Sequence, residues 1–418
     1  MRRFQESGAR DWRATPFLPG VLCACLCLAA PGTRAGGLTD TLPRNAFLLD
    51  LSYHFAWLGG AWDDKGRYGS LLPPLDRYEP GGSLQGTLTP DARVRYHITL
   101  FQLQFGLAEA LSLGIGIPLV LRTDITPDLR WTPGDVQPFL GRAYTEDDFW
   151  QWAASMGQPR PGSWTGNRNV LGDVVLGLRL RFTDFLRRAR DLGIQGAVTI
   201  QGALPTGRQA DPEEVVAAGT TMWDLQAQGD LGVHLAMEKT FGGVLEGRLT
   251  LGLDLFYEAF LPHRYASAFG RRNPLLLNYG PYVGKAYWID GGDLAGAALQ
   301  VEGVIWKGPA RASFVSGGSL DRARSLPPLW TASVRLASAW IGQTDFTSRS
   351  SVWDAMQEEK WRPGYRNVLV VSTVLSLLRL GAPLQVTAAW RSTSLIPGKN
   401  TRASDSLSVG IRIPGTFW

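Results

Sequence analysis

The feature that most constrains this chain is a long alternation of apolar and polar side chains between Met222 and Glu258. In its first half, one face collects Trp223, Leu225, Ala227, Leu231, Val233, Leu235 and Met237, and the other collects Asp224, Gln226, Gln228, Asp230, His234 and Glu238. After a break at Lys239–Gly243 the pattern resumes, with Leu245, Leu249, Leu251, Leu253, Leu255 and Tyr257 facing Glu246, Arg248, Thr250, Asp254 and Glu258. A period of two predicts strands, and the short glycine-containing break predicts a hairpin.

These two strands are unusually long, at about 15 residues against roughly 5–6 for an ordinary strand. A long strand with one apolar face and one charged face is typical of a transmembrane β-barrel, apolar toward lipid and polar toward the lumen. A soluble antiparallel sheet gives the same alternation, so one hairpin does not decide between them.

Similar runs recur along the rest of the chain and decide the fold class. We expect further strands at 45–58, 93–107, 111–121, 172–182, 194–204, 294–306, 329–341, 368–377, 384–392 and 404–413. Together with the hairpin this makes twelve, or fourteen if residues 307–328 hold a hairpin arm and another strand is hidden elsewhere. Long loops at 59–92, 122–169, 205–221, 259–286 and 342–366 all fall on one side, whereas most connections on the other are short. This asymmetry favours an all-β fold, a transmembrane up-and-down antiparallel β-barrel with short helices in its outer loops.

One strand carries an internal change of face. Its apolar positions run Val94, Tyr96, Ile98 and Leu100 and then shift to Phe101, Phe105 and Leu107. The shift predicts a β-bulge in this strand.

The start of the chain predicts export. Four arginines precede an apolar run, Phe17 to Ala30, that is too short to span a bilayer, and Thr33-Arg34-Ala35 suits signal peptidase. We therefore expect a secretory signal peptide at residues 1–35 and a barrel domain at 36–418; a membrane anchor and a lipoprotein are the alternatives. All three cysteines lie in this segment, at Cys23, Cys25 and Cys27, so the mature chain would contain no thiol.

Charge excludes one class of partner. The whole chain carries 42 Lys+Arg and 37 Asp+Glu, and residues 1–35 hold five and two of these, which leaves 37 against 35. A near-balance of +2 argues against a nucleic-acid binder, which needs a clustered basic surface.

The loop at 122–169 is rich in aromatic residues and contains a helix signal. Thr145-Glu-Asp-Asp148 forms a capping box ahead of Phe149-Trp-Gln-Trp152, and Gly157 and Pro159 follow. We expect a short helix here, and others at 211–219 and 351–360. The loop is a candidate capture site for an apolar solute, and the alternative is a loop that packs over the barrel mouth; the candidate residues are Phe149, Trp150, Trp152, Met156 and Trp164.

Charged residues on the predicted inner faces form a second candidate site. This lumen network comprises Asp50, His54, Arg93, Arg95, His97, Asp224, Asp230, His234, Arg248, Asp254 and Glu302, together with Arg179, Arg335, Arg391 and Arg412. Mixed signs at this density predict paired charges, since a lone buried charge is costly. The network either packs a narrow barrel or lines a water-filled path. The histidines lack metal-ligand spacing, and no phosphate loop, HExxH motif or marked nucleophile is present, so we expect neither a cofactor nor an enzyme.

Three phrases carry a resemblance: Phe105-Gly-Leu-Ala-Glu-Ala-Leu-Ser-Leu-Gly114, the run Leu171–Phe182, and Ala203-Leu-Pro-Thr-Gly207. Over about residues 95–210 the chain resembles the outer-membrane barrels of the meta-pathway phenol-degradation family, distant relatives of the long-chain fatty acid transporters. The resemblance implies uptake of hydrophobic or aromatic compounds. Those transporters have a substantial N-terminal plug, whereas only Gly36–Arg44 would precede the first strand here, so a mechanism driven by a plug is not implied.

Together these features predict a barrel in the outer membrane of a Gram-negative bacterium that mediates passive uptake of small hydrophobic or aromatic molecules. The alternatives are a structural or surface-interaction barrel without transport and a general porin for polar solutes. The expected partners are outer-membrane lipid, small hydrophobic solutes and the barrel-assembly machinery, the last through the C-terminal strand.

Overall fold

The fold is that of a computed structural model of the chain. It describes residues 38–71, 74–78, 83–134, 142–155, 160, 162–166, 169–207, 229–242, 249–265, 287–309, 327–343, 345–347 and 363–416. The expected signal peptide, the helices at 211–219 and 351–360, Asp224, Arg248, Met156 and most of the segment 307–328 lie outside these residues.

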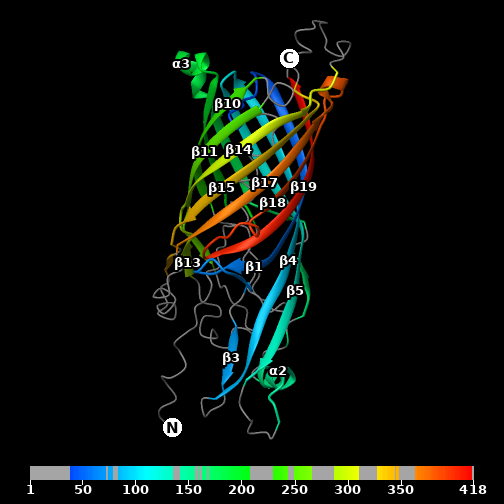
Figure 1. Cartoon of the computed structure of the whole chain (residues 1–418), viewed down its shortest axis with the longest axis vertical. Coiled ribbons are helices and arrows are strands. Elements are labelled where there is room, and N and C mark those ends of the chain that lie inside the picture. Colours follow the sequence, from blue (N-terminus) through cyan, green and yellow to red (C-terminus); the bar gives the residue numbers. More distant parts are fainter. Residues whose placement is uncertain are drawn as a thin grey trace.

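Twelve antiparallel strands close into a barrel, in which the first strand pairs with both the second and the last (Figure 1). In chain order, which is also the order around the wall, they are β1 (Ala46–Trp62), β4 (Leu84–Ala108), β5 (Leu111–Pro133), β8 (Val174–Leu180), β9 (Ile194–Leu204), β10 (Asp230–Phe241), β11 (Leu249–Phe260), β14 (Leu294–Trp306), β15 (Trp330–Ile341), β17 (Gly364–Ser376), β18 (Gln385–Ser392) and β19 (Thr401–Thr416). The predicted up-and-down barrel of twelve strands is confirmed.

Loop lengths identify the two ends of the barrel. At one end lie the start of β1, the end of β19 and the tight turn of residues 109–110 between β4 and β5. The same end carries a 3₁₀ turn, η1 (Phe182–Phe185), the helix α3 (Arg187–Asp191) and another 3₁₀ turn, η7 (Leu377–Leu380). Membrane barrels place their short turns in the periplasm and their longer loops outside the cell, so this end, at the top of Figure 1, is the periplasmic one.

The outer surface has the composition of a membrane-spanning wall. Alternate residues of each strand are exposed apolar side chains, such as Leu231, Val233 and Met237 on β10. Exposed aromatic residues mark both boundaries of this band: Trp306 and Trp330 at the periplasmic end, and Tyr257, Trp340 and Tyr365 at the outer end. Trp330 and Trp340 lie ten residues apart on β15, which spans about 33 Å of strand or roughly 25 Å of depth at the usual tilt. This matches the apolar band of an outer-membrane barrel, which is what the protein is.

Among the described residues, no helix has the length and hydrophobicity required to cross a bilayer.

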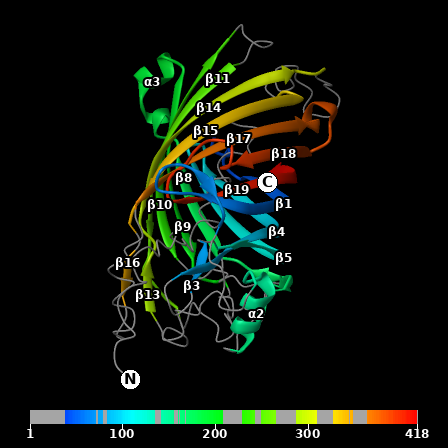
Figure 2. The same cartoon turned by 60° about the horizontal axis from the view of Figure 1, so that its bottom comes forward.

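One part of the wall continues far beyond the other strands. The outer halves of β4 and β5 form a two-stranded arm, with β3 (Leu75–Tyr78) along β4 and the helix α2 (Glu146–Ser155) at its tip (Figures 1 and 2). The short strands β6 (Trp164–Gly166) and β7 (Val170–Leu171) pair with β5, and β2 (Tyr68–Gly69) pairs with β1. A separate sheet joins two outer loops: β12 (His263–Tyr265) and β13 (Tyr287–Asp290) lie between β11 and β14, and β16 (Asp345–Thr347) lies between β15 and β17.

The predicted bulge in β4 is wrong, because the irregularity lies in the neighbouring strand of the arm. Register shifts between His97 and Ile98 because Leu121 is an extra residue on β5, so this bulge lies in β5 and not in β4. On β4 the odd-numbered residues face outward throughout. What changes at residue 100 is therefore the polarity of each face, because the strand leaves the lipid at this level.

Candidate functional site: the lumen and its outer mouth

A buried ionic cluster occupies the lumen beside β10, β11 and β15. The Arg335 guanidinium donates through Nη2 to Asp254 Oδ2 over 2.7 Å, and His234 Nδ1 lies 3.4 Å from the same oxygen. The His234 ring stacks on Phe256, with centroids 5.7 Å apart. The charged residues are each less than 5% exposed. Pairing compensates for much of the cost of removing the arginine and the carboxylate from water.

Further inward-facing charged groups are bound either by an opposite charge or by a neutral polar side chain. Arg412 Nε donates to Asp50 Oδ2 over 2.5 Å, Gln201 Nε2 donates to Glu258 Oε1 over 3.2 Å, and Arg179 Nε donates to Thr199 Oγ1 over 2.8 Å. The charges separate by sector. Acidic side chains gather on β10, β11 and β14 (Asp230, Glu238, Asp254, Glu258 and Glu302), and arginines gather on β15 to β19 (Arg335, Arg366, Arg391 and Arg412).

The burial of these groups bears on whether the lumen is open. Water in a wide channel would expose inward-facing side chains, yet Glu258, Arg412 and Asp254 are 0%, 2% and 2% exposed. In this state these charged groups are therefore not exposed to a water-filled channel.

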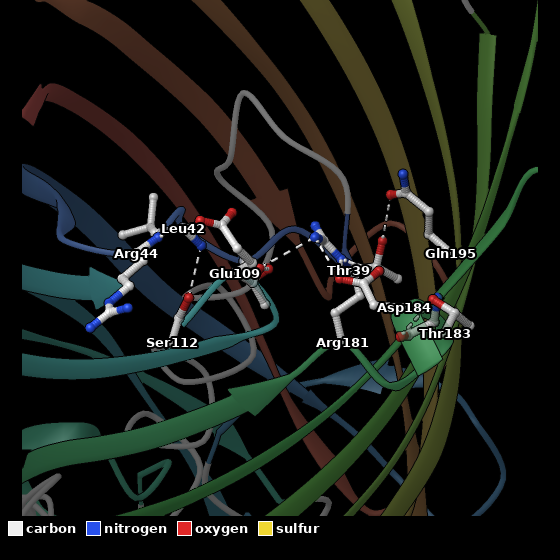
Figure 3. A network of polar contacts seen from close by, with 11 residues as sticks. Thr39, Leu42, Arg44, Glu109, Ser112, Arg181, Thr183, Asp184 and Gln195 are labelled. Carbon is white, nitrogen blue, oxygen red and sulfur yellow. Dashed lines mark hydrogen bonds and ion pairs between the residues drawn. The ribbon is translucent and has the colours of Figure 1, made fainter. Parts of the chain in front are cut away.

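A short segment before β1, residues Leu38–Asn45, crosses the periplasmic end of the lumen (Figure 3); we call it the strap. Glu238 of β10 accepts hydrogen bonds from the backbone N–H of Leu38 and Thr39 and, over 2.6 Å, from the Thr39 hydroxyl. Thr39 also bonds Gln195 on β9. Further along the strap the Leu42 N–H donates to Ser112 Oγ of β5, three strands away from β10 in the wall, over 2.8 Å. The strap therefore spans from β5 to β10 inside the barrel.

Gly106 on β4 allows this path. A Cβ at this position would lie 1.9 Å from the Pro43 carbonyl oxygen, and that backbone cannot give way cheaply. The absent side chain lets the strap lie directly on the wall. The strap thus forms a small plug, although the shortness of the segment before the first strand gave no reason to expect one.

The outer mouth has the opposite character to the lumen below it. Inward-facing side chains of β1, β4 and β5 form a buried apolar cluster, the mouth cluster, with Ala56 and Trp164 packed against it. Its buried members are Leu58, Ala61, Leu71, Ala92, Val94, Tyr96, Ile98, Val120 and Ile125. Trp164, one of the candidate capture residues, therefore belongs to the mouth.

The tip of the arm holds the other described candidates. The predicted capping box is confirmed: the Thr145 N–H and hydroxyl each donate to Asp148 Oδ2 over 2.8 Å, and the Asp148 N–H donates to Thr145 Oγ1. Hydrogen bonds from Arg142 and Thr145 hold the pKa of Asp148 well below its usual range.

The aromatic residues of α2 differ in accessibility. Phe149 and Trp150 are 3% and 6% exposed and pack with Leu88 against β4 and β5. Trp152 is only partly buried, and the Arg77 guanidinium lies 3.9 Å from its ring centroid. Phe149 and Trp150 thus fix α2 to the arm, and among the aromatic residues of α2 Trp152 is the one that remains partly accessible to a ligand.

Three residues of the predicted lumen network lie on the other side of the wall. His97 contacts Tyr53 and Phe55 on the outward face of β1, and its Nδ1 lies 2.6 Å from the Tyr53 hydroxyl. Arg93 and Arg95 share this face and are exposed. The expectation failed because it assumed the apolar face to be the lipid face at every depth, whereas above the bilayer the outward face meets water.

Most of the remaining network is where the pattern placed it. Asp50, His54, Asp230, His234 and Asp254 are buried on the inward faces, and Glu302 shares the inward parity of β14. Arg366, 1% exposed, was missed because β17 begins at Gly364, four residues before the strand expected from the valine run. The alternation of Tyr365 and Arg366 ahead of Val368 in the sequence could have shown that the strand begins earlier and that Arg366 faces the lumen.

Comparisons with known proteins agree with this architecture. A COG4313 outer membrane channel from Pseudomonas putida F1 superposes with a TM-score of 0.51 at 12% identity, over 91% of this chain and 99% of that chain. The TodX monoaromatic hydrocarbon channel and a FadL homologue from Pseudomonas aeruginosa, each 10% identical, superpose with TM-scores of 0.35 and 0.29 over 93% and 89% of this chain and 94% and 90% of theirs. No family model matches the chain, and no curated protein matches it. The likeness to the first channel shows the fold, an outer-membrane β-barrel.

Proposed function

We propose that the protein is an outer-membrane channel for small hydrophobic or aromatic molecules and that this structure is its closed state. The observation that carries the proposal is the mouth cluster. A two-stranded arm in water needs apolar side chains only where its own layers pack together. Here β1, β4 and β5 carry an additional apolar face, the mouth cluster, and this face is turned toward the barrel axis. A small hydrophobic ligand needs a site lined by apolar side chains with few polar groups, and the mouth cluster places such side chains on the lumen side of the wall.

The strap is the element whose release would open the path. It is held by hydrogen bonds to Glu238, Gln195 and Ser112 and by further bonds to Glu109, Arg179 and Gly106. Most of these bonds involve a side chain, whereas the backbone of each wall strand is bonded along two edges. Segments with fewer bonds open at lower free energy than the sheet that surrounds them. Displacing the strap would free the periplasmic end without disturbing the wall.

A structural or surface-interaction barrel without transport is the second candidate. It is favoured by the burial of the lumen-facing side chains Asp254 and Glu258, which also argues against a wide, water-filled porin for polar solutes. The COG4313 protein, which shares the fold, is named as a channel, which supports the first candidate.

Uptake into proteoliposomes tests the proposal, with an aromatic probe compared to a sugar of similar size. Val94→Thr combined with Val120→Thr makes the mouth cluster polar at nearly constant volume, and a buried hydroxyl costs about 1–3 kcal/mol. We expect slower uptake of the aromatic probe and no gain for the sugar. Thr126→Val, on the outward face of the same arm, is the matched control and should leave both rates unchanged.

The outcomes separate the candidates. If sugar passes freely through the wild type, the protein is a general pore; if neither solute passes, also after deletion of the strap, the structural role takes its place. Capture by α2 is a further proposal, which Trp152→Ala tests better than Trp150→Ala because Trp150 is part of the core of the arm.

A further inference from the structure

The outward face of the arm, where it leaves the bilayer, carries a group of cations. Arg93, Arg95 and His97 lie on the outward side of β4, and Arg122 faces outward on β5 opposite His97. Arg122 is 50% exposed and pairs with Asp124 over 2.9 Å. Among the residues that the structure describes, Arg93 and Arg95 are exposed and form no ion pair or hydrogen bond through their side chains.

The depth of this group can be worked out along β4. Leu107, at the periplasmic end, and His97 lie ten residues apart, which corresponds to about 33 Å of strand and roughly 25 Å of depth at the usual tilt. His97 is thus at the outer edge of the apolar band, beside the aromatic residues Tyr53 and Phe55. Arg95 and Arg93 follow about 5 and 10 Å further out, at the level of lipid headgroups.

The acids on this face are engaged by other groups. Asp124 is bound by Arg122 and by the Thr165 hydroxyl over 2.7 Å. Asp91, the next outward residue beyond Arg93, accepts hydrogen bonds from the backbone N–H groups of Leu71 and Ala92, and Asp128 opposite it pairs with Arg130. Asp405 lies on the far side of Trp57 in the same row and accepts hydrogen bonds from the Ser394 hydroxyl. Among the described residues, none of these acids forms an ion pair with Arg93 or Arg95.

We propose that Arg93, Arg95 and Arg122 bind the phosphate groups of a phosphorylated glycolipid of the outer leaflet, of the lipid A type, whose acyl chains lie on the apolar wall below. Guanidinium groups match phosphate oxygens in bidentate geometry. The exposed outward residues Phe101 and Leu103, directly below on the same strand, supply the acyl surface. One ligand thus satisfies both the cations and the apolar wall, and the arm is fixed at its base by lipid.

The test compares bis-phosphorylated lipid A with its dephosphorylated form, bound to detergent-solubilised protein and counted by native mass spectrometry. We expect the wild type to bind the phosphorylated lipid at least tenfold more tightly. Arg93→Gln combined with Arg95→Gln should weaken its binding about tenfold, which corresponds to about 1.4 kcal/mol. Arg130→Gln, an exposed arginine further along the arm that pairs with Asp128, is the control and should bind as the wild type does.

Several results would overturn the proposal: equal binding of the two lipids by the wild type, full binding by the double variant, or an equal loss in the control. The comparison of the two lipids uses only the wild type. It therefore tests the proposal even if a heat-modifiable gel assay shows that the double variant does not fold. Inorganic phosphate in excess should compete poorly with the lipid, because it lacks the acyl chains. If phosphate displaced the lipid at concentrations similar to those at which the lipid itself binds, the site would be one for free phosphate instead.

Discussion

The two faces of β10 allow a sharp test of the wall, because adjacent residues meet opposite environments. Val233 is 43% exposed on the outward face, and His234 is 3% exposed on the inward face. We compare Val233→Arg with His234→Gln. The first places a charge in lipid, and the second replaces one polar lumen group by another.

The expected magnitude follows from depth. Lys239, outward on the same strand with its ammonium 5.5 Å from the Phe241 ring, marks the periplasmic boundary. Val233 lies six residues above it, about 20 Å along the strand and roughly 15 Å in depth, close to the middle of an apolar band about 25 Å tall. An arginine there costs about 2–4 kcal/mol. Gln at position 234 can still donate to Asp254, which retains Arg335 over 2.7 Å, so we expect a loss of about 1 kcal/mol or less.

Reversible urea unfolding in lipid vesicles measures both free energies, and heat-modifiable band shifts on gels report assembly. Val233→Arg should lower the free energy of unfolding and reduce the folded band far more than His234→Gln. Equal effects, or a larger effect of His234→Gln, would refute the assignment of faces and with it the position of the bilayer.

Three further predictions concern the lumen and processing. Gly106→Ala should displace the strap, since its Cβ would lie 1.9 Å from the Pro43 oxygen; single-channel recordings should show more frequent opening, whereas Gly59→Ala, with no atom within 4 Å, should not differ from the wild type. Asp254→Leu leaves the Arg335 charge buried without its partner and should cost about 3–5 kcal/mol in urea unfolding, while Asp254→Leu with Arg335→Leu should recover much of the loss; a double variant as unstable as the single one would contradict this pairing. The mature protein should begin at Gly36, and N-terminal sequencing of outer-membrane material that starts before Arg34 would show the cleavage assignment to be wrong.

The barrel could be predicted from the sequence because strand alternation is a local property. Each side chain on a spanning strand points to one of two sides, so the pairs Leu231 and Asp230, or Val233 and His234, already separate lipid from lumen. Twelve such runs, with long connections on one side, are sufficient for the count. The capping box of α2 was equally local, since Thr145 and Asp148 bond within one turn.

Depth in the membrane is not a local property, and there the sequence was insufficient. Val94, Tyr96 and Ile98 have the same alternation inside or outside the bilayer, and only the position of β4 in the closed barrel shows that they face inward above the lipid while Arg93, Arg95 and His97 face out. The Leu121 bulge depends likewise on the partner strand. The strap needed the barrel as well, because Thr39 and Glu238 meet across 199 residues of chain. Local pattern determines which side chains share a face, but what each face touches is set by strands that are distant in sequence.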